Sequence, residues 1–137
     1  MTPRTLPAKD NLTISFAHVA YRMAESFALR NTGIKSFEVR SAEELEARIG
    51  EVDVLLLSGL WRNDLIAKAP KLAFIQSISA GVDQYSRDAL SAAGIRLASA
   101  QGVNERAVAE HAIALILALT GKFRRGATIR PPASGAA

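Results

Sequence analysis

Short apolar runs separated by polar, helix-patterned stretches make up most of this chain. The runs at residues 12–16, 34–39, 52–57, 72–78 and 95–98 predict five β-strands, and the run 52–57 is almost purely apolar. Apolar residues at helical spacing, or helix-start and helix-stop signals, predict helices at residues 19–29, 42–49, 63–69 and 87–92. Asn31 and Gly33 mark the end of the first helix, and Ser41 with Glu44 forms a capping box for the second.

This alternation predicts an α/β fold with a doubly wound, five-stranded parallel sheet. Right-handed crossover connections favour the flavodoxin-like strand order 2-1-3-4-5. Residues 11–103 would form this domain, after a polar, proline-bearing leader at residues 1–10 that we expect to be flexible. Residues 124–137 read as a disordered basic tail.

A long C-terminal helix is predicted at residues 104–123. Its segment 112–119 is uninterrupted by any polar residue, so it lacks the polar face of an ordinary surface helix. Leaving side chains such as Ile113 and Ile116 in water costs about 1.5–3 kcal/mol each. The helix is therefore expected to be covered, either by a second copy of the chain or by folding back onto its own sheet.

Composition narrows the functional classes. The 137 residues suffice for one compact domain, and the lack of cysteine excludes disulfides and thiolate metal sites. No run approaches the roughly 18 apolar residues of a membrane span, so we expect no membrane partner and a cytoplasmic location. The net charge of +4 comes from four basic residues near the C-terminus, which leave 13 basic and 13 acidic residues elsewhere. A neutral body with a basic tail is weak evidence for nucleic-acid binding, and we expect none.

Ligands of open α/β sheets bind beyond the carboxyl ends of the strands. His18, Ser58, the turn 79–83 and the loop 100–104 follow predicted strands and are the segments that could meet there. Gly81, preceded by the small Ala80, could present backbone amides to a carboxylate, or it could be an ordinary turn glycine. Trp61 and Arg62 are expected at the surface near this edge, and His18 is expected to be solvated.

The start of the long helix carries further polar candidates. Asn104 either caps the helix or offers its amide to a ligand. The sequence at the start of the helix favours capping alone. His111, next to Glu110, is expected to be a structural histidine rather than an acid–base group. Two distant histidines give no metal-ligand spacing, and no G-x-G dinucleotide fingerprint is present.

Three segments in order resemble one family. They are Ser79-Ala80-Gly81-Val82-Asp83, Gly94-Ile95-Arg96-Leu97, and Gly102-Val103-Asn104 leading to Val108-Ala109-Glu110-His111. Together, over residues 50–123, they resemble the N-terminal, substrate-side domain of D-isomer-specific 2-hydroxyacid dehydrogenases. The resemblance implies that Ala80 and Gly81 contact the carboxylate of a 2-hydroxy or 2-keto acid. It also implies that Val103, Asn104 and Val108 face the nicotinamide of NAD or NADP, and we add Ser58 to the substrate site from its place at a strand end.

In that family the catalytic His, its carboxylate partner and the substrate-binding Arg come from a later dinucleotide-binding domain. We therefore assign no catalytic residue here and expect no cofactor bound to this chain alone. The resemblance implies the substrate-binding half of a dehydrogenase, truncated after about residue 123, inactive by itself and dimeric through residues 104–122. The alternatives are a non-catalytic dimerisation module or a receiver-type signalling module, although Ala17, Ser58 and Ala98 stand where a receiver needs its acidic residues and lysine.

Overall fold

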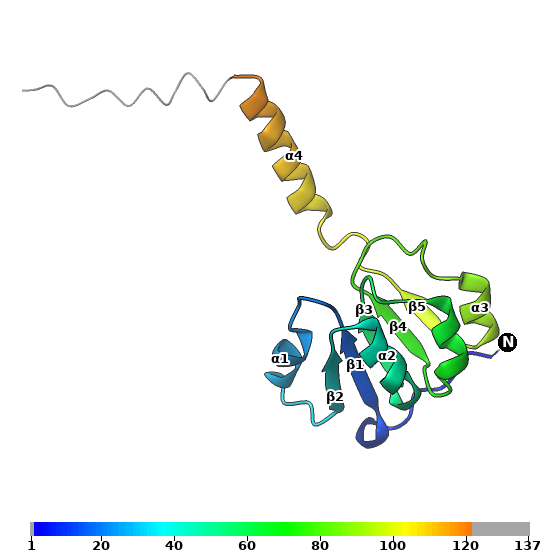
Figure 1. Cartoon of the computed structure of the whole chain (residues 1–137). Coiled ribbons are helices and arrows are strands. Elements are labelled where there is room, and N and C mark those ends of the chain that lie inside the picture. The colour runs from blue at the N-terminus through cyan, green and yellow to red at the C-terminus, as the bar shows by residue number, and fades with distance from the viewer. Residues whose placement is uncertain (1, 122–137) are drawn as a thin grey trace, which may run out of the picture. The chain divides into compact units, whose positions relative to one another are not determined.

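A computed structural model describes residues 2–121 of the chain. Five parallel strands form one sheet with the order β2-β1-β3-β4-β5, so the predicted flavodoxin-like arrangement is confirmed (Figure 1). The strands are β1 (Thr13–Ala17), β2 (Lys35–Val39), β3 (Val54–Leu57), β4 (Phe74–Ser77) and β5 (Arg96–Ala98). The helices are α1 (Met23–Ala28), α2 (Ala42–Arg48), α3 (Arg87–Ala92) and α4 (Glu105–Leu119), with short 3-10 helices at Lys9–Asn11, Ile49–Glu51 and Asn63–Lys68.

Burial follows position in the sheet. Every residue of the central strand β1 is buried, whereas the edge strands β2 and β5 begin with the exposed residues Lys35 and Arg96. β5 has only three residues, whereas β2 has five, as many as β1. A core of aliphatic side chains lies against the sheet, formed by Val39, Leu45, Ile49, Val52, Leu55, Leu57, Leu65, Leu72, Ile75, Leu90 and Ile95. This burial accounts for the nearly continuous apolar sequence of the middle strands.

Asp53 joins the starts of two central strands. Its carboxylate accepts a hydrogen bond from the buried backbone amide of Thr13 at 2.8 Å, and its own amide donates to the Thr13 carbonyl at 3.0 Å. The Asp53 carbonyl accepts from the amides of Ala73 and Phe74. The side chain is therefore a structural acceptor at the amino end of the sheet, the end opposite to the expected ligand site.

The first helix is shorter than its apolar spacing predicts, and it begins at Met23 rather than residue 19. The reason is His18, whose Nδ1 accepts hydrogen bonds from the amides of Ala20 at 3.0 Å and Tyr21 at 2.9 Å. These bonds hold residues 19 and 20 in a bend and leave no helical hydrogen bonding there. At the other end, Asn31 and Gly33 have φ angles of 47° and 73°, the left-handed conformation expected of a helix stop.

The second helix begins as predicted. The Ser41 hydroxyl accepts from the Glu44 amide at 3.2 Å, and the Glu44 carboxylate accepts in return from the Arg40 amide at 2.7 Å. The return bond thus goes one residue before the cap, a small departure from the expected capping box.

The N-terminal segment differs from the flexible leader that its composition predicts. The Arg4 amide donates to the Gly94 carbonyl at 2.9 Å, and the Arg4 guanidinium donates to the carbonyls of Ala69 at 2.8 Å and Leu72 at 2.9 Å. Figure 1 shows the N-terminus running beside α3. These contacts join residues more than 60 positions apart, and no local sequence pattern signals them.

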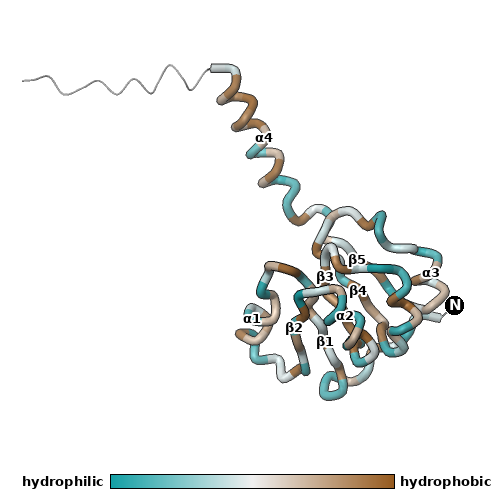
Figure 2. The backbone as a smooth tube through the Cα atoms, in the orientation of Figure 1, coloured by the Kyte–Doolittle hydropathy of each residue, from teal (hydrophilic) through white to brown (hydrophobic). Residues whose placement is uncertain are grey.

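The chain divides into two compact units, residues 1–101 and 102–137, and the second is described here only through residue 121. In that unit α4 has no buried residue, and its large apolar side chains are exposed, including Ile113 at 57%, Ile116 at 59% and Leu119 at 87%. Figure 2 shows the hydrophobic colouring of its C-terminal half. Residues 122–137, where the basic tail was expected, lie outside the described part. No helix among the described residues has the length and apolarity needed to cross a membrane.

Candidate functional site

The carboxyl ends of β3 and β4 bring two serine-bearing loops together. Leu57 pairs with Ser77 in the sheet register, and the Ile78 amide donates to the Leu57 carbonyl at 3.0 Å just beyond it. The next residue on one side is Ser58, and its hydroxyl lies 2.7 Å from the Ser79 hydroxyl in a mutual hydrogen bond. Ser58 therefore lies against the loop that carries Ala80 and Gly81, although it comes more than 20 positions earlier in the sequence.

Ser79 is held from three directions. Its amide donates to the Ser77 hydroxyl at 3.3 Å, and its carbonyl accepts from the Ala100 amide, beyond β5, at 3.1 Å. With the Ser58 bond, one residue connects the loops that follow β3, β4 and β5. The loop that begins at Ser79 is thus fixed at its base before any ligand arrives.

Ala80 and Gly81 are exposed residues beside this fixed base. Within residues 2–121 no hydrogen bond uses the amide of either residue. A Cβ placed on Gly81 would have no atom within 4 Å, and its φ lies outside the left-handed region. Gly81 is therefore not required by its own backbone conformation, and the space above it is open to a ligand.

Asn63 holds the far side of this loop through hydrogen bonds. Its Oδ1 accepts from the Trp61 indole at 3.0 Å and from the Ser86 amide at 2.9 Å, while its Nδ2 donates to the Gln84 carbonyl at 3.2 Å. Sequence reasoning did not select Asn63, because an asparagine at the start of a 3-10 helix has no local feature that reveals partners 20 positions away.

Trp61 is buried, contrary to expectation, whereas Arg62 lies at the surface as expected. Trp61 is only 7% exposed, and its ring packs against the ring of Tyr85 with centroids 5.6 Å apart. The guanidinium of Arg62 is paired with Glu46 at 2.6 Å and Asp64 at 2.9 Å, and this pairing raises its pKa. Trp61 is thus core, and Arg62 belongs to an exposed ion network that also holds Lys68.

Tyr85 has a buried hydroxyl below the loop that makes no hydrogen bond among the described residues. The residue is 4% exposed, and its hydroxyl lies near Ser77 and Gln84 but has the geometry of a hydrogen bond with neither. Desolvation by burial raises the pKa of the phenol, against the smaller opposing effects of the two neighbours. The hydroxyl is buried beneath the loop and is not presented to a ligand.

The histidines also differ from expectation in detail. His18 is not simply solvated, because its ring accepts the two amide hydrogen bonds described above and stacks on Tyr21 with centroids 4.1 Å apart. His111 is exposed in α4, so it is not a buried structural histidine within its unit, and Glu110 pairs with Arg106 at 2.7 Å. No cluster of three metal-ligating side chains occurs in the part of the chain that the structure describes.

The second unit contains the residues considered for the cofactor. Asn104 occupies the N-cap position of α4, but its side chain makes no capping hydrogen bond, so the favoured capping role is wrong. Its carboxamide is free of partners among the described residues, while Val103 and Val108 are 75% and 64% exposed. Asn104, Val108 and His111 line one shallow groove along α4, together with Ala107, Ala112 and Leu115.

Comparison with known proteins places these features in a family context. The family model "D-isomer specific 2-hydroxyacid dehydrogenase, catalytic domain" matches residues 16–130. A D-3-phosphoglycerate dehydrogenase of Mycobacterium bovis is 36% identical over 78 residues, which is 56% of this chain and 15% of that protein. An erythronate-4-phosphate dehydrogenase of Pseudoalteromonas translucida is 39% identical over 77 residues, 55% of this chain and 21% of that protein.

Solved structures of similar fold include a dehydrogenase and a reductase. The NAD-dependent formate dehydrogenase of Staphylococcus aureus in complex with NAD aligns with a TM-score of 0.65 and 21% identity, over 84% of this chain and 40% of that one. The pyruvate reductase of Chlamydomonas reinhardtii aligns with a TM-score of 0.63 and 22% identity, over 96% of this chain and 44% of that one. At this identity the likeness establishes the fold. The chain spans less than half the length of the relatives it matches.

Proposed function

Because the chain belongs to the D-isomer-specific 2-hydroxyacid dehydrogenase family, we propose that it forms the substrate-binding half of an enzyme interconverting a 2-hydroxy acid and its 2-keto acid. The observation that carries this proposal is the pair of unused backbone amides at Ala80 and Gly81, beside the Ser58–Ser79 hydroxyl pair. Successive amides bind an anionic oxygen without a charged side chain. The Ser58 hydroxyl then lies within reach of the same substrate.

A preformed loop favours binding of a small acid. The base of the loop is fixed by Ser58, Ser77 and Ala100, and its far side is fixed by Asn63. A carboxylate that meets amides already in place does not have to order the loop, so more of the interaction energy appears as affinity. The open space above Gly81 is required because a larger residue there would project into the path of the ligand.

The groups available in the second unit fit a nicotinamide cofactor, NAD or NADP. The Asn104 carboxamide has both a donor and an acceptor and is not consumed by capping, and the exposed Val103 and Val108 offer apolar surface. A nicotinamide cofactor supplies the hydride when it is bound. In this proposal the first unit holds the substrate carboxylate at Ala80 and Gly81, and the second unit offers Asn104 and the two valines to the nicotinamide.

We further propose that these 137 residues do not complete the reaction by themselves. Hydride transfer needs a cofactor and a proton-transferring group held against the substrate carbon. The ring of His18 is engaged by backbone amides, and the sequence has no G-x-G fingerprint. Purified protein should therefore show no NADH oxidation above background with pyruvate or glyoxylate. A rate that depends on the keto acid would refute this proposal.

The exposed apolar residues of α4 support a homodimer through this helix. Residues 112–119 leave several large aliphatic side chains in water within the unit, which is unfavourable for an isolated helix. We propose that a second copy covers them. A non-catalytic dimerisation module would share this property, so dimerisation alone does not separate the two functions, whereas binding of a keto acid at Gly81 does.

The substrate site can be tested by titrating the protein with pyruvate and following its backbone amide resonances. We expect the largest shifts at Ala80 and Gly81, and a Kd at least fivefold weaker in Gly81→Ala, whose added methyl group meets nothing in the fold but blocks the ligand. Gly50→Ala is the matched control, because its φ is also ordinary and its new Cβ would make only an ordinary contact at 3.6 Å. Unchanged binding in Gly81→Ala would refute the assignment.

A further inference from the structure

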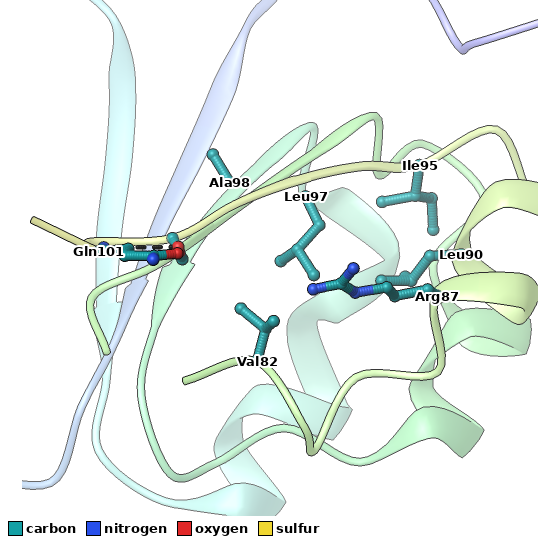
Figure 3. A pocket seen from close by; sticks show the side chains of 8 residues that line it. Val82, Arg87, Leu90, Ile95, Leu97, Ala98 and Gln101 are labelled. Atoms are coloured by element: carbon teal, nitrogen blue, oxygen red, sulfur yellow. Dashed lines mark hydrogen bonds between the residues drawn. The ribbon is translucent and has the colours of Figure 1, made fainter. Parts of the chain in front are cut away.

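A cavity lies behind the proposed substrate loop, entirely within the first unit. It has a volume of about 230 Å³ and is bounded by α3, β5 and the residue that follows Gly81. Figure 3 shows the side chains that line it, which are Val82, Arg87, Leu90, Ile95, Leu97, Ala98, Ser99 and Gln101. None of them is among the residues assigned above to substrate or cofactor.

The lining combines apolar walls with one cation. Five of the eight side chains are aliphatic, and Leu90 and Ile95 are almost fully buried. Arg87 extends from α3 across the cavity towards Leu97 and Val82 (Figure 3). At the opposite end the Ser99 hydroxyl accepts from the Gln101 amide at 3.4 Å.

The guanidinium of Arg87 has no partner that would explain its position. The nearest acidic residues in sequence are Asp83 and Asp88, and no ion pair or hydrogen bond within residues 2–121 joins Arg87 to either. Within residues 2–121 the arginines at positions 22, 40, 48, 62 and 106 each contact a carboxylate, whereas Arg87, like Arg30, contacts none. A guanidinium over an apolar wall without a carboxylate is a ready partner for one brought by a ligand.

We propose that this cavity binds a small organic carboxylate with a compact apolar body, such as an aryl or branched aliphatic acid. The carboxylate pairs with Arg87, and the hydrocarbon lies against Leu90, Ile95 and Leu97. The volume agrees with this class, because an apolar cavity of about 150 Å³ holds benzene. A benzoate-sized molecule fills the remaining space with its carboxylate.

A ligand bound in this cavity would affect the conformation of the substrate loop. Val82 forms one wall, and it directly follows Gly81 in the chain. Ser99 and Gln101 form another wall and flank Ala100, whose amide binds the Ser79 carbonyl. A ligand in the cavity therefore contacts neighbours of both ends of the loop, which makes it a candidate modulator of binding at the proposed substrate site.

The test is a titration of the full chain with benzoate, followed through backbone amide resonances. We expect shifts at Val82, Leu97, Ala98 and Ser99, with a Kd of about 1 mM, as suits a ligand of this size. Benzamide has the same shape without the charge and should bind about tenfold more weakly, and acetate has the charge without the ring and should not saturate. Shifts of equal size with benzoate and benzamide would overturn the role of Arg87.

Two variants test whether benzoate binds in this cavity or elsewhere on the protein. Arg87→Gln, at an exposed helix position, should weaken benzoate about tenfold while leaving the unfolding midpoint within error. Arg30→Gln removes an exposed arginine near the other edge of the sheet and should bind benzoate as the parent does. Benzoate shifts that persist in Arg87→Gln, or that lie in α4 instead, would refute the proposal. Pyruvate binding at Gly81 is measured separately, so either site can fail without the other.

Discussion

Gly94, between α3 and β5, offers a sharp test of how the N-terminal segment stabilises the fold. Its φ of 70° is left-handed, and a Cβ placed there would lie 3.0 Å from the Thr2 carbonyl oxygen and 3.3 Å from the Arg4 amide nitrogen. The Gly94 carbonyl is also the acceptor for the Arg4 amide. Gly94→Ala therefore strains the local backbone and pushes against a segment about 90 positions earlier in sequence.

The expected loss has two parts. An alanine in the left-handed conformation costs about 1–2 kcal/mol. Displacing the segment weakens the Arg4 amide bond and the two guanidinium bonds to Ala69 and Leu72, which adds about 1–2 kcal/mol for a half-buried arginine. The total of about 2–4 kcal/mol is a large fraction of the stability of an ordinary domain.

Urea unfolding followed by circular dichroism measures this loss. Gly33→Ala is the matched control, because its φ of 73° is as left-handed but a Cβ there would meet nothing within 4 Å. It should lose only about 1–2 kcal/mol. Arg4→Ala and Gly94→Ala should be less than additive when combined, since both release the same segment. Equal losses at Gly33 and Gly94, together with additivity at Arg4, would show that the N-terminal segment is not docked.

Three further predictions concern other parts of the molecule. Burial raises the pKa of Tyr85, so the unfolded state loses its phenolic proton first and the free energy of unfolding should fall above about pH 10. Urea unfolding at pH 9 and pH 11 measures this fall, which should be smaller in Tyr85→Phe. Asp53→Ala should cost about 1–3 kcal/mol because the Thr13 amide loses its buried acceptor, whereas Asp53→Asn should lose less than half of that, and equal losses would contradict the assigned role. Ile116→Lys, at a 59% exposed position of α4, should convert the proposed dimer to monomer in sedimentation velocity, and a parent chain that is already monomeric would refute the dimer.

Much of the fold followed from the sequence because its signals are local. Strand order came from five apolar runs separated by helices, together with the handedness of crossovers, and the Ser41 cap was readable from two residues three apart. Helix length was overestimated at α1 because apolar spacing does not reveal that the His18 ring would bind the amides at positions 20 and 21. A side-chain cap of that kind depends on the rotamer and not on the periodicity.

The candidate site was only partly accessible to the same reasoning. Ser58 and Gly81 could be selected because strand ends of a parallel sheet converge, and the structure places the Ser58 hydroxyl on the neighbouring loop. Burial of Trp61 and the bridging role of Asn63 depend on partners more than 20 positions away, which no window of sequence contains. For Asn104 the sequence left both roles open, and the preference for capping was wrong because a good capping residue need not adopt the capping geometry.

The character of the two sheet edges restricts how copies of this protein can associate. Strands β2 and β5 both start with an exposed basic residue, Lys35 and Arg96, and β5 has only three residues. Like charges brought together along an open edge repel, and a three-residue strand offers few unpaired backbone groups to an incoming strand. Addition of further strands at these edges is therefore disfavoured. A partner can bind the exposed apolar surface of α4 without the sheet edges starting the growth of fibrils.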